Sequence, residues 1–125
     1  MTYPTGLFKT QLEQQGISPR EYLFQARATA FHSKGKYNPA NLFFSSDDIH
    51  KLEYHLPGRV VRFGRSGYGD FIIYSALERS GREPGLAGAK RYAYLTRARR
   101  IKGDWKDDPY SPNRLAMRIL WEDTK

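Results

Sequence analysis

The sequence contains no cysteine. It can therefore form no disulfide, no cysteine-ligated zinc site, no iron–sulfur cluster and no thiol nucleophile. It also lacks an apolar run close to the roughly 20 residues that cross a bilayer. Residues 1–9 lack the basic start and apolar stretch of a secretory signal. We therefore expect a cytoplasmic protein with no membrane contact, and its 125 residues have room for a single domain, residues 1–125.

Positive charge is in excess and is unevenly placed. The chain has 21 Lys and Arg against 13 Asp and Glu, a net charge of +8. Residues 59–102, the central basic segment, contain 11 of the basic and only 3 of the acidic residues, so the excess lies there. Such a field attracts polyanions and weakens with salt. Because net charge also keeps a small domain in solution, the composition favours a nucleic-acid partner without requiring one.

The first 53 residues are expected to be mainly helical. Ser18 can cap a helix that Pro19 begins, and an apolar stripe at four-residue spacing continues it over residues 19–31. Residues 7–12 suggest a short earlier helical turn. The cluster of capping side chains at residues 45–48 predicts a second short helix over residues 49–53.

From residue 54 onward the pattern is typical of strands. Apolar alternation or short apolar runs predict strands at residues 59–63, 70–74, 91–99 and 115–121. Glycine-rich or aperiodic stretches predict loops at residues 64–69, 77–90 and 103–113. Helices followed by strands in so short a chain indicate an α+β fold. We expect a small curved or closed β-barrel, made by residues 54–125, with one or two N-terminal helices in residues 1–53 covering it.

Four motifs in fixed order resemble a known family. They are Tyr54-His55-Leu56-Pro57, Gly69-Asp70-Phe71-Ile72-Ile73-Tyr74, Tyr92-Ala93-Tyr94-Leu95-Thr96-Arg97-Ala98-Arg99-Arg100-Ile101 and Asp108-Pro109-Tyr110. This series resembles the PUA-like domain, related to EVE and ASCH domains, at the N-terminus of prokaryotic HNH restriction endonucleases. It spans residues 54–120. Leu56 and Phe71 stand where the family usually has Phe and Trp, and no HNH nuclease motif follows. The resemblance implies a curved barrel that binds nucleic acid and accepts a flipped or modified base in a cleft, in a phage or defence setting.

The case for catalysis is weak. Asp47 and His50 have a spacing that could place two metal ligands on one helix face, but Asp47 is also a good helix-capping residue. The chain lacks a Gly-x-Ser-x-Gly elbow and the Lys-Ser/Thr ending of a phosphate-binding loop. We assign no catalytic residue, no metal ligand and no cofactor, and expect the chain not to be an enzyme.

The candidate binding residues are cationic, aromatic or placed in the family motifs. Arg97 and Arg99 would share a strand face at about the spacing of successive phosphates, although a charged strand edge also guards against aggregation. His55 is either a base or phosphate ligand or a packing residue beside the turn, and Asp70 is either a base acceptor or a turn former. The full set is His55, Arg62, Arg65, Tyr68, Asp70, Arg97, Arg99, Arg100, Lys102 and Trp105.

These observations predict a non-catalytic nucleic-acid-binding domain, with DNA favoured over RNA and with modified-base recognition. The alternative is an inhibitor or adaptor that docks on an acidic protein partner through the same basic surface. A third hypothesis is a metal-dependent nuclease that uses Asp48, His50 and His55.

Overall fold

The computed structural model describes residues 3–81 and 85–122, and it begins with two helices. α1 (Gly6–Gln14) is followed by α2 (Pro19–His32), whose N-cap is Ser18 and whose first residue is Pro19. The predicted long N-terminal helix is therefore confirmed, and the predicted short helical turn is a helix of nine residues. The apolar stripe of α2 (Tyr22, Leu23, Ala26 and Ala30) is buried.

A three-stranded antiparallel sheet follows. After the short 3-10 helix η1 (Pro39–Asn41) come β1 (Leu42–Phe44), β2 (His50–Leu56) and β3 (Arg59–Arg65), in the spatial order β1-β2-β3. Pro57 and Gly58 make the β2–β3 turn, where Gly58 adopts a φ of +70° that other residues rarely take. The sheet is open, so the expected β-barrel is wrong.

The predicted helix over residues 49–53 is also wrong, because residues 50–53 belong to β2. The capping side chains before them close a loop instead of starting a helix. The Asp47 carboxylate accepts hydrogen bonds from the backbone N–H groups of Ile49 and His50, at 3.1 and 2.8 Å, and turns the chain into β2.

The second half of the chain is helical rather than stranded. α3 (Phe71–Arg79), α4 (Leu86–Ala98), the 3-10 helix η2 (Asp104–Asp107), α5 (Pro112–Leu115) and a π-helical turn, η3 (Ala116–Leu120), occupy it. The strands predicted at residues 70–74, 91–99 and 115–121 are therefore wrong. Of the predicted loop over residues 77–90, residues 77–79 belong to α3 and residues 86–90 to α4, while residues 82–84 lie outside the described residues. Of the four predicted strands, only residues 59–63 form one.

Helix-capping signals explain this outcome. Asp70 is the N-cap of α3, where its Oδ1 accepts the Ile73 N–H at 2.9 Å. Ser111 caps α5 in the same way and is followed by Pro112, as Ser18 is followed by Pro19 in α2. In α4 the buried residues are Ala87, Leu95 and Ala98, which fit a helical period and not the alternation of a strand.

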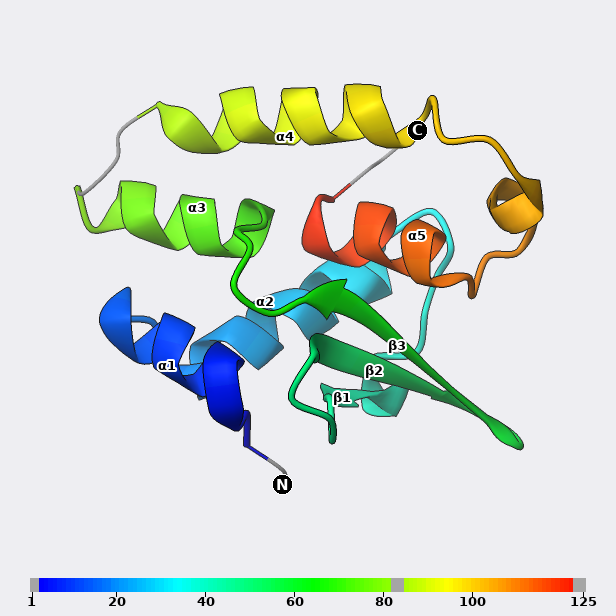
Figure 1. The fold of residues 1–125 in the computed structure, drawn as a ribbon, viewed down its shortest axis with the longest axis horizontal. Coiled ribbons are helices and arrows are strands. Elements are labelled where there is room, and N and C mark those ends of the chain that lie inside the picture. Colours follow the sequence, from blue (N-terminus) through cyan, green and yellow to red (C-terminus); the bar gives the residue numbers. More distant parts are fainter. Residues whose placement is uncertain (1–2, 82–84, 123–125) are drawn as a thin grey trace.

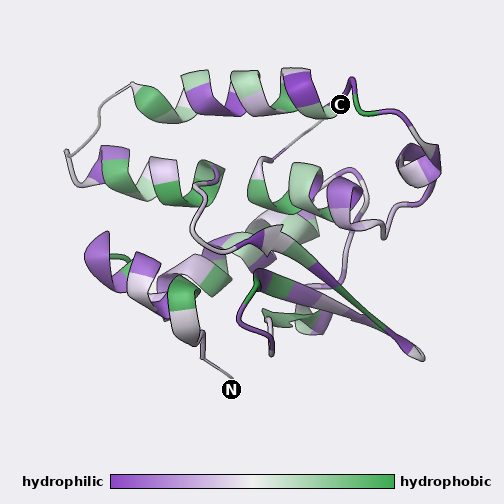
Figure 2. Ribbon diagram, viewed as in Figure 1, coloured by the Kyte–Doolittle hydropathy of each residue, from purple (hydrophilic) through white to green (hydrophobic). Residues whose placement is uncertain are grey.

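The elements are arranged in layers (Figure 1). α4 runs along the top, α3 and the α5–η3 segment lie beneath it, and α2 and the sheet lie below these. α2 contacts both α3 and η3, and β3 contacts α5 and η3, so one hydrophobic core joins the two halves of the chain. Figure 2 shows hydrophobic residues prominent on α3 and η3, and hydrophilic residues along the segment after α4. Over the described residues, none of the helices combines the length and the hydrophobicity needed to span a membrane.

A buried ion pair ties three elements together at the centre of the fold. The Lys51 ammonium of β2 lies 2.9 Å from Oδ2 of Asp70, and both side chains are almost fully buried, at 2% and 1% exposure. The Tyr22 hydroxyl of α2 donates to the same oxygen at 2.6 Å. Burial, and then the Asp70 carboxylate, raise the pKa of Tyr22 well above its ordinary value, so the phenol keeps its proton.

We expect Asp70→Asn to destabilise the protein strongly. Removing one partner leaves the Lys51 charge buried and unpaired, which costs about 3–5 kcal/mol. Tyr22→Phe is the matched control, because it deletes one hydrogen bond to the same oxygen and should cost only about 1–2 kcal/mol. Urea denaturation followed by circular dichroism measures both values. Equal losses in the two variants would contradict the central role of the ion pair.

Candidate nucleic-acid interface

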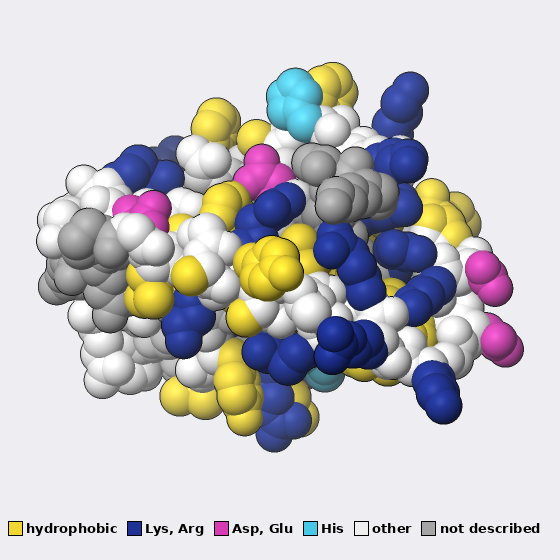
Figure 3. Space-filling view, turned by 90° about the horizontal axis from the view of Figure 1, so that it is seen from above, with side chains coloured by type: hydrophobic (Ala, Val, Ile, Leu, Met, Phe, Trp, Pro, Cys, Tyr) yellow, Lys and Arg dark blue, Asp and Glu magenta, His cyan; other side chains and the backbone are white. Residues whose placement is uncertain are grey.

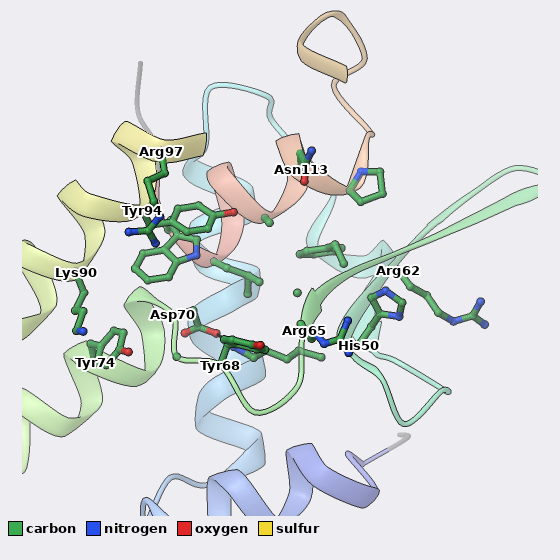
Figure 4. A pocket seen from close by; sticks show the side chains of 18 of the residues that line it. His50, Arg62, Arg65, Tyr68, Asp70, Tyr74, Lys90, Tyr94, Arg97 and Asn113 are labelled. Carbon is green, nitrogen blue, oxygen red and sulfur yellow. Dashed lines mark hydrogen bonds and ion pairs between the residues drawn. The ribbon is translucent and has the colours of Figure 1, made fainter. Parts of the chain in front are cut away.

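A cavity of about 630 Å³ opens between β3, the start of α3, α4 and the α5–η3 segment (Figure 4). Five of the ten predicted binding residues line it: Arg62, Arg65, Tyr68, Asp70 and Arg97. The other five, namely His55, Arg99, Arg100, Lys102 and Trp105, do not line it. We call this cavity the central pocket.

The lower side of the central pocket is a turn held in place from α1. The Gln11 side chain donates to the carbonyl of Tyr68 and accepts the N–H of Gly67, each at 2.9 Å. The Ser66 N–H donates to the carbonyl of Ile49 at 2.8 Å, so the residue that precedes β2 also holds the turn. The turn backbone is therefore fixed, while the Tyr68 ring stays 66% exposed.

One face of α4 forms the opposite side. Lys90, Ala93, Tyr94 and Arg97 line the pocket, and their spacing of three, four and seven residues is that of a single helix face. The Tyr94 ring stacks on Trp121, with ring centroids 4.3 Å apart and planes within 10°. Burial raises the pKa of Tyr94, and the nearby Arg97 charge lowers it by a smaller amount. Tyr94 is thus a neutral, fixed aromatic wall.

Asp70 is the only acidic residue among those that line the pocket, and its carboxylate is already bound. It accepts hydrogen bonds from Tyr22, Lys51 and the N–H of Ile73. Of the two alternatives for Asp70, the structure places it as a capping residue, with a fully buried carboxylate rather than a free base acceptor. The remaining charge along the pocket is positive.

Four predicted cations follow one another at the end of α4. Arg97, Arg99, Arg100 and Lys102, here called the α4 cationic cluster, are all exposed. Figure 3 shows Lys and Arg side chains gathered over the half of this face where Figure 1 places the end of α4 and the segment after it. The expected strand spacing of Arg97 and Arg99 is wrong, because helical residues two apart point in different directions.

Ion pairing separates Arg97, Arg100 and Lys102 of this cluster from several other cations of the central basic segment. Arg59 pairs with Asp108, Arg79 with Glu21, and Arg62 with Asp47 and Glu53. Within residues 3–81 and 85–122, no ion pair joins an acidic side chain to Arg65, Lys90, Arg97, Arg100 or Lys102. The uncompensated positive charge therefore lies on α4 and the pocket rim.

His55 belongs to a separate polar network on the sheet. Its Nε2 lies 2.6 Å from Oε2 of Glu53, and its ring packs against Phe43 with centroids 4.6 Å apart. Burial alone would raise the pKa of Glu53, but hydrogen bonds from His55 and Ser46 hold it below its ordinary value. These contacts place His55 as a packing residue of the sheet, away from the central pocket.

His50, which the sequence suggested only as a metal ligand, lines the pocket instead of His55. Its Nδ1 lies 2.8 Å from Oδ2 of Asp47. Burial alone would raise the pKa of Asp47, but hydrogen bonds from the backbone and ring of His50, the Ser45 hydroxyl and the Ile49 N–H lower it well below its ordinary value. Across the part of the chain that the structure describes, no three His, Asp or Glu side chains gather where they could hold a metal ion.

Trp105 lies in η2, where its ring is flanked by two cations. The Lys106 ammonium and the Arg114 guanidinium each lie 5.6 Å from its ring centre. The Trp105 Nε1–H donates to the carbonyl of Ile101 at 3.2 Å. The Trp105 ring therefore packs between side chains of η2 and α5 and does not line the central pocket.

The residues predicted from the sequence did not include Tyr74, Lys90, Tyr94 and Asn113, which also line the pocket. A helical reading of residues 90–97 would have found Lys90, Tyr94 and Arg97 together, because they recur at the helix period. Gln11 gave no signal in the sequence, since its partners are backbone groups 56 and 57 residues away.

We expect Glu53→Gln to reduce the fall in the free energy of unfolding that occurs as the pH is lowered from 6 to 3. A carboxyl group whose pKa is lowered in the folded state contributes stability above its ordinary pKa, near 4.5, and loses it as the pH falls through the lowered value. The variant should be less stable at pH 6 by about 1.5–3 kcal/mol, because a buried ionised acceptor is lost. Its loss between pH 6 and pH 3 should be smaller than that of the parent protein.

Glu13→Gln is the matched control, because Glu13 is exposed and its one ion pair among the described residues, with Lys9, spans 4.0 Å. Urea denaturation at several pH values between 6 and 3 measures the profiles. A Glu53→Gln profile parallel to that of the parent protein would contradict the assignment.

Comparison with known proteins adds no relative. No family model matches the chain, and no curated protein or solved structure matches it either. The PUA-like resemblance of the motifs therefore stays a prediction, and the barrel that it implies is absent. The charge, the aromatic rings and the pocket are the features of this chain that bear on its function.

Proposed function

We propose that this chain is a non-catalytic nucleic-acid-binding domain that holds the phosphate backbone with the α4 cationic cluster. DNA is favoured over RNA, and a modified base is a candidate for recognition, because of the motifs that resemble restriction-enzyme domains. The observation that carries the proposal is the concentration of positive charge at the end of α4, where Arg97, Arg100 and Lys102 pair with no acidic side chain of the described residues.

Phosphate groups are the ligands best suited to this surface. Lysine and arginine side chains supply most of the contacts that position a protein on a nucleic-acid backbone. Arg100 and Lys102 form no ion pair within the described residues, so phosphate binding would not require an existing ion pair to be broken. Arg97 belongs both to the cluster and to the central pocket, so a bound strand would pass the pocket opening.

A second candidate function, binding to a protein partner through an aromatic face of α2 rather than through the basic surface, is favoured by a different observation. Phe24 and Phe31 on α2 are 68% and 62% exposed, and they are seven residues apart on one helix face. Exposed aromatic side chains of this kind are common at protein interfaces. This face is distinct from the α4 cationic cluster, so the two functions are separable by mutation.

The test is binding of labelled duplex and single-stranded DNA across a salt series, with and without modified cytosine, followed by fluorescence polarisation. The triple variant Arg99→Ala, Arg100→Ala, Lys102→Ala should bind at least about tenfold more weakly at 0.1 M salt. The slope of log K against log salt should fall by about 2 to 3, since roughly one counterion is released for each phosphate contact.

The matched control removes three exposed cations elsewhere, with Lys9→Ala, Arg20→Ala and Lys34→Ala, and so makes the same change in net charge. Equal weakening by both triple variants would show that net charge acts without a defined surface. An absence of binding at every salt concentration would overturn the proposal. Recovery of one stoichiometric protein from the native host after nuclease treatment, lost in Phe24→Ala, would favour the alternative.

A further inference from the structure

The central pocket has the dimensions and lining of a small-molecule site that strand binding does not require. Its volume of about 630 Å³ lies within the range of ligand pockets, about 300–1,000 Å³. Apolar side chains such as Ile49, Ala93 and Leu120 form part of the wall. Polar and charged groups converge on it from β3, α3 and α4.

Aromatic rings lie on two sides of the pocket. Figure 4 shows Tyr68 and Tyr94 on opposite sides, with Tyr74 at one end. Tyr94 is already stacked on Trp121, so its position is fixed. The Tyr68 ring makes no aromatic or cation–π contact with any described residue and is held on a rigid turn. A planar ring could stack on these groups, a contact worth about 1–3 kcal/mol in nucleic-acid complexes.

Cations surround the same space. Lys90 and Arg65 lie at opposite ends in Figure 4, and Arg97 lies beside Tyr94. His50 stands next to Arg65, whereas Arg62 points away from the cavity. The buried Lys51 is neutralised by Asp70, and Asp70 has its partners inside the protein, so neither repels an incoming anion nor competes for these cations.

We propose that the central pocket binds one nucleoside monophosphate. The base stacks on Tyr68 and Tyr94, and the phosphate is held at one end of the pocket, by Arg65 at one end or by Lys90 and Arg97 at the other. The unit is either a free nucleotide or a single nucleotide of a strand held by the α4 cationic cluster. The inference therefore stands without the proposed function, because a free nucleotide makes the same contacts.

Isothermal titration calorimetry with the full chain tests the site, using thymidine monophosphate, thymidine, inorganic phosphate and an unlabelled single-stranded oligonucleotide. The monophosphate should bind at least about tenfold more tightly than thymidine or phosphate alone, since each of these lacks one half of the contacts. Tighter binding of the oligonucleotide would identify a strand as the source of the nucleotide, and tighter binding of the monophosphate would identify a free nucleotide.

Matched variants locate the site. Tyr68→Ala should weaken monophosphate binding at least about tenfold, while Tyr92→Ala, which removes a tyrosine that is 75% exposed and outside the pocket, should leave it unchanged. The pair Arg65→Ala, Lys90→Ala should weaken it likewise, and the pair Arg20→Ala, Lys34→Ala, two exposed cations outside the pocket with the same charge change, should not.

Circular dichroism and urea denaturation confirm that each variant is folded before it is titrated. Three results would overturn the proposal: no heat of binding with the monophosphate, equal affinity for inorganic phosphate, or binding that is insensitive to Tyr68 and to the Arg65 and Lys90 pair. If the parent protein binds the monophosphate but not the oligonucleotide, the proposed function alone is overturned. The two failures are therefore distinguishable.

Discussion

The buried Lys51–Asp70 ion pair is the constraint on which the rest of the structure depends. Asp70 begins α3 as its N-cap, binds Lys51 of β2 and accepts from Tyr22 of α2, so one carboxylate fixes three elements. Two charges in the interior are costly unless their remaining hydrogen-bonding groups are satisfied, and here Asp70 has three donors. The pair therefore specifies one arrangement of the helices against the sheet.

That arrangement also creates the candidate site. With β2 and α3 joined at the pocket floor, the turn at residues 66–68 must cross between β3 and α3, and Gln11 holds it there. α4 packs on α3 and brings Lys90, Tyr94 and Arg97 to the other side of the same space. Asp70, the acidic residue that lines the pocket, is paired with Lys51 inside the protein. The pocket and the adjoining end of α4 therefore present positive charge to solvent.

The sequence was sufficient where the local signal and the tertiary structure agree. The Ser18-Pro19 cap and the stripe of α2 predicted that helix, and the alternation of Val61 and Phe63 predicted β3. It failed where a short apolar run is ambiguous. Residues 70–74, which form the N-cap and first turn of α3, are buried or half-buried, and residues 115–121 are almost wholly buried, so neither run shows a clear period. Ser111-Pro112 has the same helix-start pattern as Ser18-Pro19 of α2. The apolar residues that follow it, over residues 115–121, also alternate as they would in a strand. In the candidate site, the charge pattern pointed to Arg65 and Arg97, whereas His50 and Lys90 needed the fold to bring them to the pocket.

The account is tested most directly by nuclear magnetic resonance of the backbone amides during titration with single-stranded DNA. It predicts shifts concentrated on residues 64–69 and 90–102, which carry the pocket turn and the α4 cationic cluster. Residues 20–31 of α2 should be unaffected. Shifts concentrated around Phe24 and Phe31, or spread evenly over the molecule, would contradict it.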